Sequence, residues 1–506
     1  MSLSRIATRA ALGVKAPLVM VEVHISSGLP GLSLVGLPEK TVKEARDRVR
    51  SAIINSGFTF PAKRVTVNLA PADLPKEGGR FDLPIAIAIL AASEQLPDVQ
   101  MAQYEFLGEL ALSGALRGIQ GAIPAAIAAK EAGRRLILPA ENATDVGLVD
   151  QKESLVADSL TEICAFLLQQ HTLSPGRAEE RDKEEIAEDL SDIIGQQQGK
   201  RALEVAAAGG HNLLLIGPPG TGKTMLAMRL TGLLPPLTDS EALECATIAS
   251  IINSGGVHKQ WRKRPFRLPH HSSTLYALIG GGAIPQPGEI TLAHNGVLFL
   301  DELPEFSRKT LDSLREPLES GEITISRARA KVTWPARFQL VAAMNPSPTG
   351  HYQGKHNRSS PQQTLRYLSR LSGPFLDRFD LSLEIPLLPT GMLSQPQRET
   401  ESSEQVRERV LKARKYQLAR QGKVNAQMTN AEVQKWCELQ KEDAEWLESI
   451  LVTLGLSVRA WQRLLKVSRT IADLAEEEVL KRSHLLEALS YRGMDRMMAH
   501  LHKSLE

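Results

Sequence analysis

Cysteine is scarce in this 506-residue chain, which holds only Cys164, Cys245 and Cys437. The three stand far apart, and none belongs to a Cys-x-x-Cys pair. The sequence therefore excludes a disulfide framework and a metal site built from closely spaced thiolates. This pattern is typical of proteins in a reducing compartment, so we expect a cytoplasmic location.

Long hydrophobic runs and a large net charge are also lacking. The longest apolar stretch, residues 83–92, is too short to cross a bilayer and predicts a buried helix. Residues 1–20 carry three basic side chains without a long apolar core, so we expect neither a signal peptide nor a membrane association. Because the net charge is only +2, any surface that binds nucleic acid must be a local cluster of basic residues.

The chain is long enough for about three domains. Residues 1–170 mix strand and helix patterns and predict an α/β domain. Residues 171–188 are polar and dense in charge, as expected of a linker. Strand and helix patterns alternate from 189 to 386, which predicts a parallel sheet with crossover helices. Residues 387–506 are rich in Glu, Lys, Arg, Leu and Ala and predict a helical domain with one long helix at 402–421.

A glycine-rich loop between an apolar strand and a helix is the most specific motif. Glycines let backbone N–H groups turn around a phosphate chain, and the helix N-terminus adds the positive end of its dipole. Lys223 can reach the β- and γ-phosphates, and the Thr224 hydroxyl can bind Mg²⁺. The flanking strand and helix argue against a chance match. We therefore predict that ATP and Mg²⁺ are bound by Gly217, Pro218, Pro219, Gly220, Thr221, Gly222, Lys223 and Thr224.

Polar residues follow two further apolar strands of the same domain. Asp301 and Glu302 end the first. We predict that Asp301 holds Mg²⁺ and that Glu302 orients and deprotonates the attacking water. Strands often end in acids, but the position after a phosphate loop strengthens this prediction. Asn345 ends the second strand and is predicted to position that water; an asparagine that starts a turn before Pro346 is an equal alternative.

Three arginines are candidates for contacts to the transferring phosphate. Phosphoryl transfer is accelerated by a cation, often supplied by a neighbouring subunit, and Arg378 is the predicted residue, with Arg370 as the alternative. An ion pair of Arg378 with Asp377 or Asp380 is the structural interpretation. Arg459, near the start of a C-terminal helix, is predicted to contact phosphates from a lid, and a solvated helix arginine is the default for such a residue.

These segments, in this order, resemble the motifs of AAA+ ATPases: Walker A, Walker B, sensor 1, arginine finger and sensor 2. The segment 189–196 resembles the stretch that packs near the adenine in that superfamily, so Ile194 and Gly195 are expected beside the base. The segments 270–273, 287–294, 367–374 and 463–474 narrow the resemblance to the magnesium-chelatase-like ComM/YifB family.

The resemblance covers nearly the whole chain and implies a homo-hexameric ring ATPase. Members called ComM are implicated in natural transformation and in branch migration of DNA. Many members carry a cysteine cluster between sensor 1 and the arginine finger. Here residues 347–363 have no cysteine, and Ser347, Ser359 and Ser360 stand instead, so we predict no zinc there. We also expect no metal at His270 and His271, since no carboxylate or cysteine lies close to them in the sequence.

The first domain resembles the Lon-protease-like fold, a ribosomal-protein-S5-type domain, through residues 75–84 and 107–114. An active Lon-type site needs a serine nucleophile and a lysine base. The turn here reads Gly79-Arg80-Phe81 without a serine, and Lys130 is the first lysine of the later helix, beyond the expected position. We therefore predict a scaffold without protease activity. Arg80 is expected to form an ion pair with Asp82 or Glu77 rather than to contact a phosphate.

Two basic inserts are candidates for DNA contact. Residues 321–338 predict a β-hairpin, which in related AAA+ helicases points into the central pore. Arg327, Arg329 and Lys331 stand at alternate positions and could share one face or the tip. A charged edge hairpin in solvent is the alternative. The second insert, 255–271, combines aromatic residues with basic ones that include Arg262, Lys263 and Arg264, as suits a single strand. A basic surface loop or a subunit contact is its alternative.

An ATP-driven DNA helicase or translocase, specifically a branch-migration motor acting on single-stranded or branched DNA, is the function these features favour. A protein-remodelling AAA+ ATPase would need an aromatic and hydrophobic pore loop, and the basic hairpin argues against it. An ATP-dependent protease is disfavoured by the missing serine and lysine. A chelatase-like motor would require a separate catalytic subunit and a porphyrin.

Overall fold

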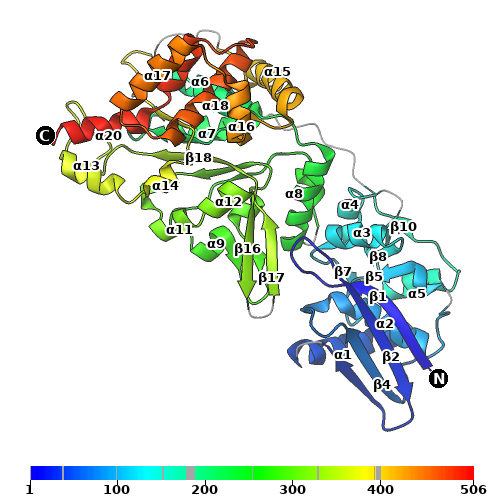
Figure 1. The fold of residues 1–506 in the computed structure, drawn as a ribbon. Coiled ribbons are helices and arrows are strands. Elements are labelled where there is room, and N and C mark those ends of the chain that lie inside the picture. Colours follow the sequence, from blue (N-terminus) through cyan, green and yellow to red (C-terminus); the bar gives the residue numbers. More distant parts are fainter. Residues whose placement is uncertain are drawn as a thin grey trace.

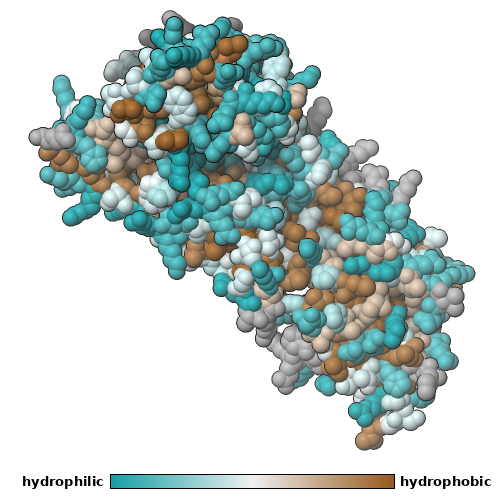
Figure 2. Space-filling view, in the orientation of Figure 1, coloured by the Kyte–Doolittle hydropathy of each residue, from teal (hydrophilic) through white to brown (hydrophobic). Residues whose placement is uncertain are grey.

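The computed structural model describes residues 2–36, 39–98, 100–150, 153–177, 188–253, 255–327, 330–392, 394 and 400–505. It is elongated, with an N-terminal unit at one end and a core covered by C-terminal helices at the other (Figure 1). Hydrophilic side chains cover most of the face in Figure 2, and hydrophobic ones gather near the junction of the two parts. None of the helices in the described ranges combines the length and apolar character needed to cross a bilayer.

The N-terminal unit is built on an eight-stranded mixed sheet. Strand β1 (Ser2–Arg9) pairs antiparallel with β2 (Leu18–Ser26), and β2 pairs antiparallel with β4 (Arg64–Ala70). Alternate residues of these strands are fully buried, which is the pattern of a sheet with one face on the core. Its strands stand in the order β10 (Ser174–Pro175), β9 (Leu155–Ala157), β8 (Arg135–Pro139), β5 (Tyr104–Phe106), β1 (Ser2–Arg9), β2 (Leu18–Ser26), β4 (Arg64–Ala70) and β3 (Gly31–Val35).

Helix α2 (Asp82–Ala92) is buried along its whole length, which confirms the buried helix predicted from the apolar run. An apolar helix without a polar face can lie only inside a core. The unit also contains the helices α1 (Glu39–Asn55), α3 (Ala122–Glu131), α4 (Ala143–Val146) and α5 (Leu160–Leu167), and a hairpin of β6 (Glu109–Leu110) with β7 (Leu116–Arg117).

The structure of this unit differs from the sequence-based expectations at two places. Strand β10 pairs with β9, so the first part of the predicted linker 171–188 belongs to the N-terminal sheet, and residues 178–187 lie outside the described residues. Asp82 pairs with Arg48 (Nε to Oδ2, 2.6 Å), not with Arg80. The Arg80 side chain is buried and donates from Nη1 to the Gln120 carbonyl at 3.4 Å.

The N-terminal unit docks on the core through α3. Ile123 of α3 packs with Ala246 of α8 (Asp239–Ile252) and with Val257. The backbone N–H of Gly121 donates to the Ser250 carbonyl at 2.6 Å. Apolar packing and backbone hydrogen bonds therefore join the two parts.

The core sheet has five parallel strands in the order β12 (Phe266–Arg267), β15 (Val297–Leu300), β18 (Gln339–Met344), β11 (Leu213–Ile216) and β19 (Leu381–Glu384). This confirms the predicted α/β domain with a parallel sheet. Because all five strands run the same way, their carboxyl ends share one edge of the sheet and their amino ends share the other.

Helices cover both faces of this sheet, as parallel sheets require. Val297 and Phe299 of β15 face one layer, and Leu298 and Leu300 face the other. The first face is covered by α6 (Gln197–Gly209), α7 (Lys223–Leu233) and several C-terminal helices. The second face and the sheet edges carry shorter elements: α9 (Leu275–Ile279), β13 (Gly280–Gly281), β14 (Gln286–Pro287), α10 (Glu289–Leu292), α11 (Arg308–Asp312), α12 (Arg315–Ser320), α13 (Pro361–Leu368) and α14 (Gly373–Leu376).

The predicted β-hairpin is present as β16 (Glu322–Arg327) and β17 (Ala330–Pro335), which project from the core toward the N-terminal unit (Figure 1). The loop between β1 and β2 reaches the hairpin, because a Cβ atom at Gly13 would lie 2.5 Å from Cγ1 of Val332. Leu12 and Val14 pack against the same apolar cluster. The N-terminal unit therefore contacts the hairpin directly.

The C-terminal residues form six helices in the described part: α15 (Ser403–Gln421), α16 (Asn430–Trp436), α17 (Lys441–Thr453), α18 (Val458–Leu474), α19 (Arg482–Ser490) and α20 (Gly493–Lys503). The Ser402 side chain caps α15 with a capping box, and the helix matches the predicted span 402–421. Helices α15 and α18 pack on the α6 and α7 face, whereas α20 packs on the opposite face beside β19.

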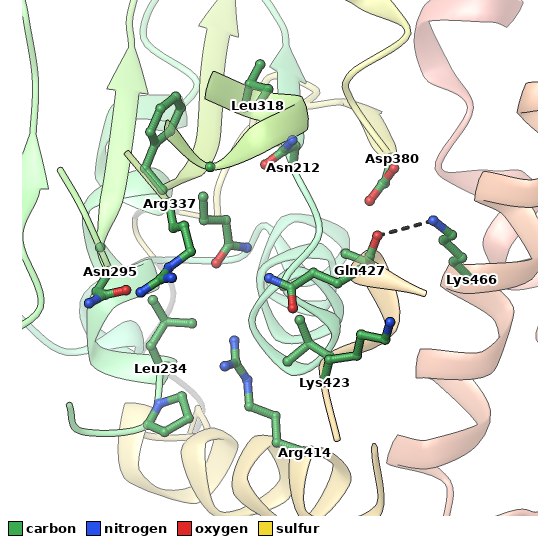
Figure 3. Close-up of a pocket in the computed structure, with 18 of the residues that line it drawn as sticks. Asn212, Leu234, Asn295, Leu318, Arg337, Asp380, Arg414, Lys423, Gln427 and Lys466 are labelled. Carbon is green, nitrogen blue, oxygen red and sulfur yellow. Dashed lines mark hydrogen bonds between the residues drawn. The ribbon is translucent and has the colours of Figure 1, made fainter. Parts of the chain in front are cut away.

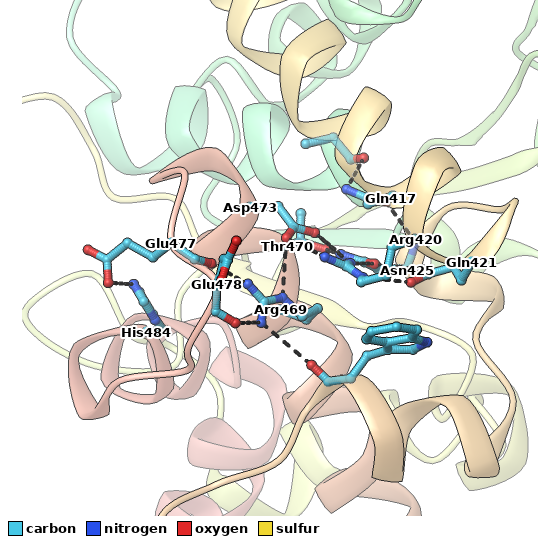
Figure 4. Close-up of polar contacts among 12 residues, drawn as sticks. Gln417, Arg420, Gln421, Asn425, Arg469, Thr470, Asp473, Glu477, Glu478 and His484 are labelled. Atoms are coloured by element: carbon cyan, nitrogen blue, oxygen red, sulfur yellow. Dashed lines mark hydrogen bonds and ion pairs between the residues drawn. The ribbon is translucent and has the colours of Figure 1, made fainter.

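A buried polar network ties α15 to α18 (Figure 4). The Asp473 carboxylate accepts two hydrogen bonds from Arg420, at 2.8 and 2.9 Å, and one from Arg469 Nε at 3.2 Å. Asn425 donates to the same carboxylate at 2.9 Å and to the Thr470 hydroxyl at 3.0 Å. Buried charges of this kind are stable only when each has its partner.

Replacing the central carboxylate tests this network. The Asp473→Ala variant leaves Arg420 and Arg469 without a counter-charge, and we expect a loss of about 3–5 kcal/mol in unfolding free energy. Urea unfolding followed by circular dichroism measures it. The matched control is Glu445→Ala on the exposed side of α17, for which we expect a change below about 0.5 kcal/mol. Equal losses in the two variants would contradict the importance of the network.

Candidate nucleotide-binding site

The glycine loop joins the carboxyl end of β11 to the start of α7. Gly220 and Gly222 have φ values of 78° and 85°, the left-handed conformation that other residues rarely adopt. No heavy atom lies within 4 Å of the position that a Cβ would take at either residue. Gly217 is different, since its Cβ would lie 2.5 Å from the Ile385 carbonyl oxygen. The loop is therefore packed against Ile385 at its first glycine, whereas the space beside the other two glycines is free.

Lys223, the first residue of α7, folds back over this loop. Its Nζ lies 2.8 Å from the carbonyl oxygens of both Gly217 and Pro218. Burial lowers the pKa of Lys223, while the Asp301 carboxylate acts in the opposite direction. The ammonium group therefore lies in the loop with only weak neutral acceptors, and phosphate oxygens would be stronger partners.

Thr224 and Asp301 meet at the carboxyl edge of the sheet. The Thr224 hydroxyl donates to Asp301 Oδ2 at 2.9 Å, and the Glu302 backbone N–H donates to Asp301 Oδ1 at 2.9 Å. A hydroxyl and a carboxylate at this spacing are hard oxygen donors, which is the chemistry that Mg²⁺ prefers. The donor set fits the predicted metal.

Glu302 has a partner that we did not expect. Its carboxylate oxygen Oε2 lies 3.1 Å from His271 Nδ1, and the Glu302 backbone is left-handed, with φ 51°. No carboxylate lies close to the two histidines in the sequence, but strand pairing brings the segment after β12 beside the end of β15 and so brings Glu302 to His271. Within the described residues, no group of three His, Cys, Asp or Glu side chains could hold a metal ion.

Asn345 and the segment around Gly195 also lie at the loop. Asn345 Oδ1 is 3.5 Å from Lys223 Nζ. Gln196, directly after Ile194 and Gly195, donates from Nε2 to the Thr221 carbonyl at 3.1 Å. The sheet therefore brings the predicted Walker A, Walker B, sensor 1 and adenine-side residues to one place.

Arg378 and Arg459 lie elsewhere. Asn212, which precedes β11, donates to the Arg378 carbonyl at 3.0 Å, so Arg378 is at the amino edge of the sheet, opposite the glycine loop. Its guanidinium forms an ion pair with Glu319. Burial lowers the pKa of Arg378, and Arg315, Arg459 and Arg463 lower it further. The lid places Arg459 beside Arg378, away from the chain's own glycine loop, and its contact with phosphates stays a prediction.

Arg370, the alternative finger, has a different position. Its Nη1 lies 3.1 Å from Glu305 Oε1, and Glu305 follows Glu302 on the same turn. Arg370 is thus on the side of the chain's own Walker B acids.

The basic residues proposed for DNA contact separate into two groups. Arg327 and Lys331 are both exposed near the hairpin tip, but they lie on opposite faces of the hairpin. Arg327 comes two residues after the buried Ile325 and lies on its face, whereas Lys331 comes two residues before the exposed Thr333 and lies on the outer face. Of the two predicted arrangements, one shared face or a shared position at the tip, the hairpin gives the second for these two residues. Arg329 lies outside the described residues.

In the second insert, Arg264 points inward. Its guanidinium donates to the carbonyl oxygens of Pro235 at 2.6 Å and Asn295 at 2.7 Å, so it is not available to a strand on the surface. Arg262 forms an ion pair with Asp239, and Lys263 is exposed. The grouping of these three cations in the sequence does not persist in space.

Three family models match the chain. "Magnesium chelatase, subunit ChlI" matches residues 189–393, "Subunit ChlI of Mg-chelatase" matches 21–142, and "Magnesium chelatase, subunit ChlI C-terminal" matches 400–492. The matches cover parts of the N-terminal unit, the core and the C-terminal helices.

Relatives extend this similarity to the whole length. The chain is 64% identical over 505 residues to YifB of Escherichia coli, covering 100% of both proteins. It is 60% identical over 508 residues to competence protein ComM of Haemophilus influenzae, covering 99% of both. A stretch of 256 residues, 47% of this chain and 25% of the relative, is 27% identical to DNA replication licensing factor Mcm2 of Drosophila melanogaster. This chain therefore belongs to the ComM/YifB family of magnesium-chelatase-like AAA+ proteins.

Proposed function

We propose that the protein is an ATP-hydrolysing motor that assembles as a homo-hexameric ring and moves single-stranded or branched DNA, as a helicase or translocase. The observation that carries the proposal is the division of the site between two edges of one sheet. Lys223, Thr224 and Asp301 lie at the carboxyl edge, and Arg378 lies at the amino edge. A single chain therefore holds the phosphate-binding half of one site and the cationic half of another.

Each residue at the carboxyl edge has a proposed role. Lys223 exchanges its carbonyl acceptors for β- and γ-phosphate oxygens. Thr224 and Asp301 hold Mg²⁺, which when bound neutralises charge on the phosphates. Glu302 orients the attacking water and accepts its proton, and Asn345 positions that water. Ile194 and Gly195 lie on the adenine side.

The neighbouring subunit supplies the cations. Arg378 and Arg459 lie together at the amino edge and cannot reach the glycine loop of their own chain. In a closed ring with head-to-tail contacts, this edge of one subunit faces the carboxyl edge of the next. Arg378 then stabilises charge on the transferred phosphoryl group, with Arg459 beside it.

The hairpin is the proposed grip on DNA. Arg327 and Lys331 are exposed near a tip that projects from the core, and cations there can contact phosphates on either side of the hairpin. The similarity to competence protein ComM and to the replication factor Mcm2 supports a nucleic acid substrate. Arg329 and the exposed pair Arg262 and Lys263 are further candidates for this contact.

The domains follow from the same assignment. We propose a Lon-protease-like scaffold without protease residues at 1–170, a linker within 171–188, the AAA+ domain at 189–386 and a helical lid at 387–506, in a protein that works in the cytoplasm. A protein-remodelling ATPase or a chelatase-like motor would use the same ATP site, but DNA would not stimulate its ATP turnover. Stimulation of ATP turnover by nucleic acid therefore separates the three functions.

Removing the proposed base tests the hydrolytic site. We expect Glu302→Gln to bind ATP normally and to hydrolyse it at least about 100-fold more slowly, since a general base contributes roughly 10²–10⁴ in rate. Phosphate release and fluorescent nucleotide binding measure the two effects. The exposed Glu442→Gln serves as control. Normal turnover by Glu302→Gln would remove this residue from its role.

Mixing two inactive variants tests the shared site. Lys223→Ala disables the glycine loop and Arg378→Ala disables the finger, so each ring alone should be inactive. In an equal mixture, roughly one interface in four pairs an intact loop with an intact finger, and we expect about a quarter of wild-type ATPase activity. Absence of any recovery in rings of confirmed mixed composition would show that Arg378 does not act on its neighbour.

Charge reversal tests the hairpin. We expect Arg327→Glu with Lys331→Glu to abolish stimulation of ATPase by DNA while leaving basal turnover intact. Measured against salt, the logarithm of DNA affinity should fall less steeply, by about one unit of slope for each lost phosphate contact. Lys441→Glu, an exposed lysine on α17, is the control. Unchanged DNA stimulation would place the grip elsewhere.

A further inference from the structure

A cavity of about 1450 Å³ lies at the amino edge of the core sheet, on the opposite side from the glycine loop. One side of the cavity is formed by residues at the strand starts, including Asn212 and Gln339, and the facing side by α15 and α18 of the lid (Figure 3). Figure 2 shows the surface hollowed along this boundary between core and lid. The volume exceeds that of a pocket for a typical small ligand, about 300–1,000 Å³.

The lining of this cavity is strongly basic. Ten of the lining residues are arginine or lysine, and four are aspartate or glutamate. Arg414, Arg337 and Lys423 extend from different elements toward the same space in Figure 3, together with the amide side chain of Gln427. A cavity with this charge attracts anions.

The excess charge is not spread evenly. At the end near α18, Arg378 pairs with Glu319 and Arg463 pairs with Asp377. Both cations therefore have acidic partners, and Arg378 is also the residue proposed above to act on the neighbour's nucleotide.

At the other end, Arg414 and Arg264 have only carbonyl partners. Arg414 donates from Nε and Nη2 to the Ala207 carbonyl, at 2.8 and 2.6 Å. Arg264 uses Nε and Nη1 for the carbonyls of Pro235 and Asn295. Within the described chain, Arg414 Nη1 and Arg264 Nη2 have no acceptor, and the neighbouring Lys415 has no ionic partner.

Placing these two cations together is costly. Burial lowers the pKa of Arg414 to about 9, with repulsion from Arg264 as the next cause, and burial lowers the pKa of Arg264 as well. Glu241 is the acid whose charge acts on both, and it forms no ion pair with either in the described structure. An anion in the cavity would relieve this cost by accepting the remaining N–H donors.

We propose that this cavity is a second anion site, which binds a small molecule carrying two or more phosphate groups through Arg264, Arg414 and Lys415. It is separate from the glycine loop and lies at the other end of the cavity from Arg378, so its test does not require the proposed function. Because Arg264 belongs to the core and the other two cations belong to the lid, the bound anion would link core and lid.

Binding of tripolyphosphate to the full-length Lys223→Ala protein tests the site, since this background weakens competition by the glycine loop. Isothermal titration at one fixed ionic strength measures the affinity, and ATP forms a second arm. We expect Arg414→Gln to weaken binding roughly tenfold or more, the value of one lost charged hydrogen bond. Lys412→Gln, on the exposed side of the same helix, should leave it unchanged.

Lys415→Gln provides a second variant, since Arg414 also holds the Ala207 carbonyl and its loss could disturb the fold. Lys415 is exposed to the cavity and makes no internal bond, so we expect weaker binding with an unchanged melting temperature. Equal affinity for ATP and tripolyphosphate would identify the phosphate chain as the ligand, and tighter ATP binding would identify a nucleotide; both support the site. Absence of binding, or binding lost in Arg378→Ala but kept in Arg414→Gln and Lys415→Gln, would overturn it.

Discussion

The common direction of five core strands is the constraint on which the rest of this structure depends. Parallel strands gather their carboxyl ends at one edge, where the glycine loop, Asp301 and Asn345 meet within hydrogen-bond reach. The same direction sends the residues before each strand, including Arg378, to the far edge. Arg378 therefore does not reach the glycine loop of its own chain, and this geometry supports the proposed ring.

Positive charge is concentrated at the amino edge of the core sheet. Arg378 and Arg264 of the core and Arg414 and Arg459 of the lid line one cavity at this edge, and the lid helices that carry the latter two are held together by the Asp473 network. Some of these cations have acidic partners and others do not. The lid therefore has two functions in this structure: it packs its helices against one another, and it holds several cations close together. Anions bound from outside the chain, as proposed above, would stabilise these cations.

The sequence predicted what depends on local order and could not predict what depends on packing. The strand, glycine loop and helix around Lys223 are contiguous, so their pattern was sufficient. The contact of His271 with Glu302 joins residues that are about thirty positions apart and needed the strand order to become visible. Arg264 sat among basic neighbours in the sequence, yet burial turned it inward. The position of Arg459 beside Arg378 could not be predicted either, because tertiary contacts, and not a local motif, set how the lid lies over the sheet.

The contact between Gly13 and Val332 has a mechanical consequence. A glycine fits against the hairpin where any side chain would collide, so the β1–β2 loop acts as a stop on one flank of β17. Leu12 and Val14 would become exposed to water if the hairpin moved away, so that displacement would cost free energy. In the proposed motor, a movement of the hairpin would therefore either carry the N-terminal unit with it or break these apolar contacts.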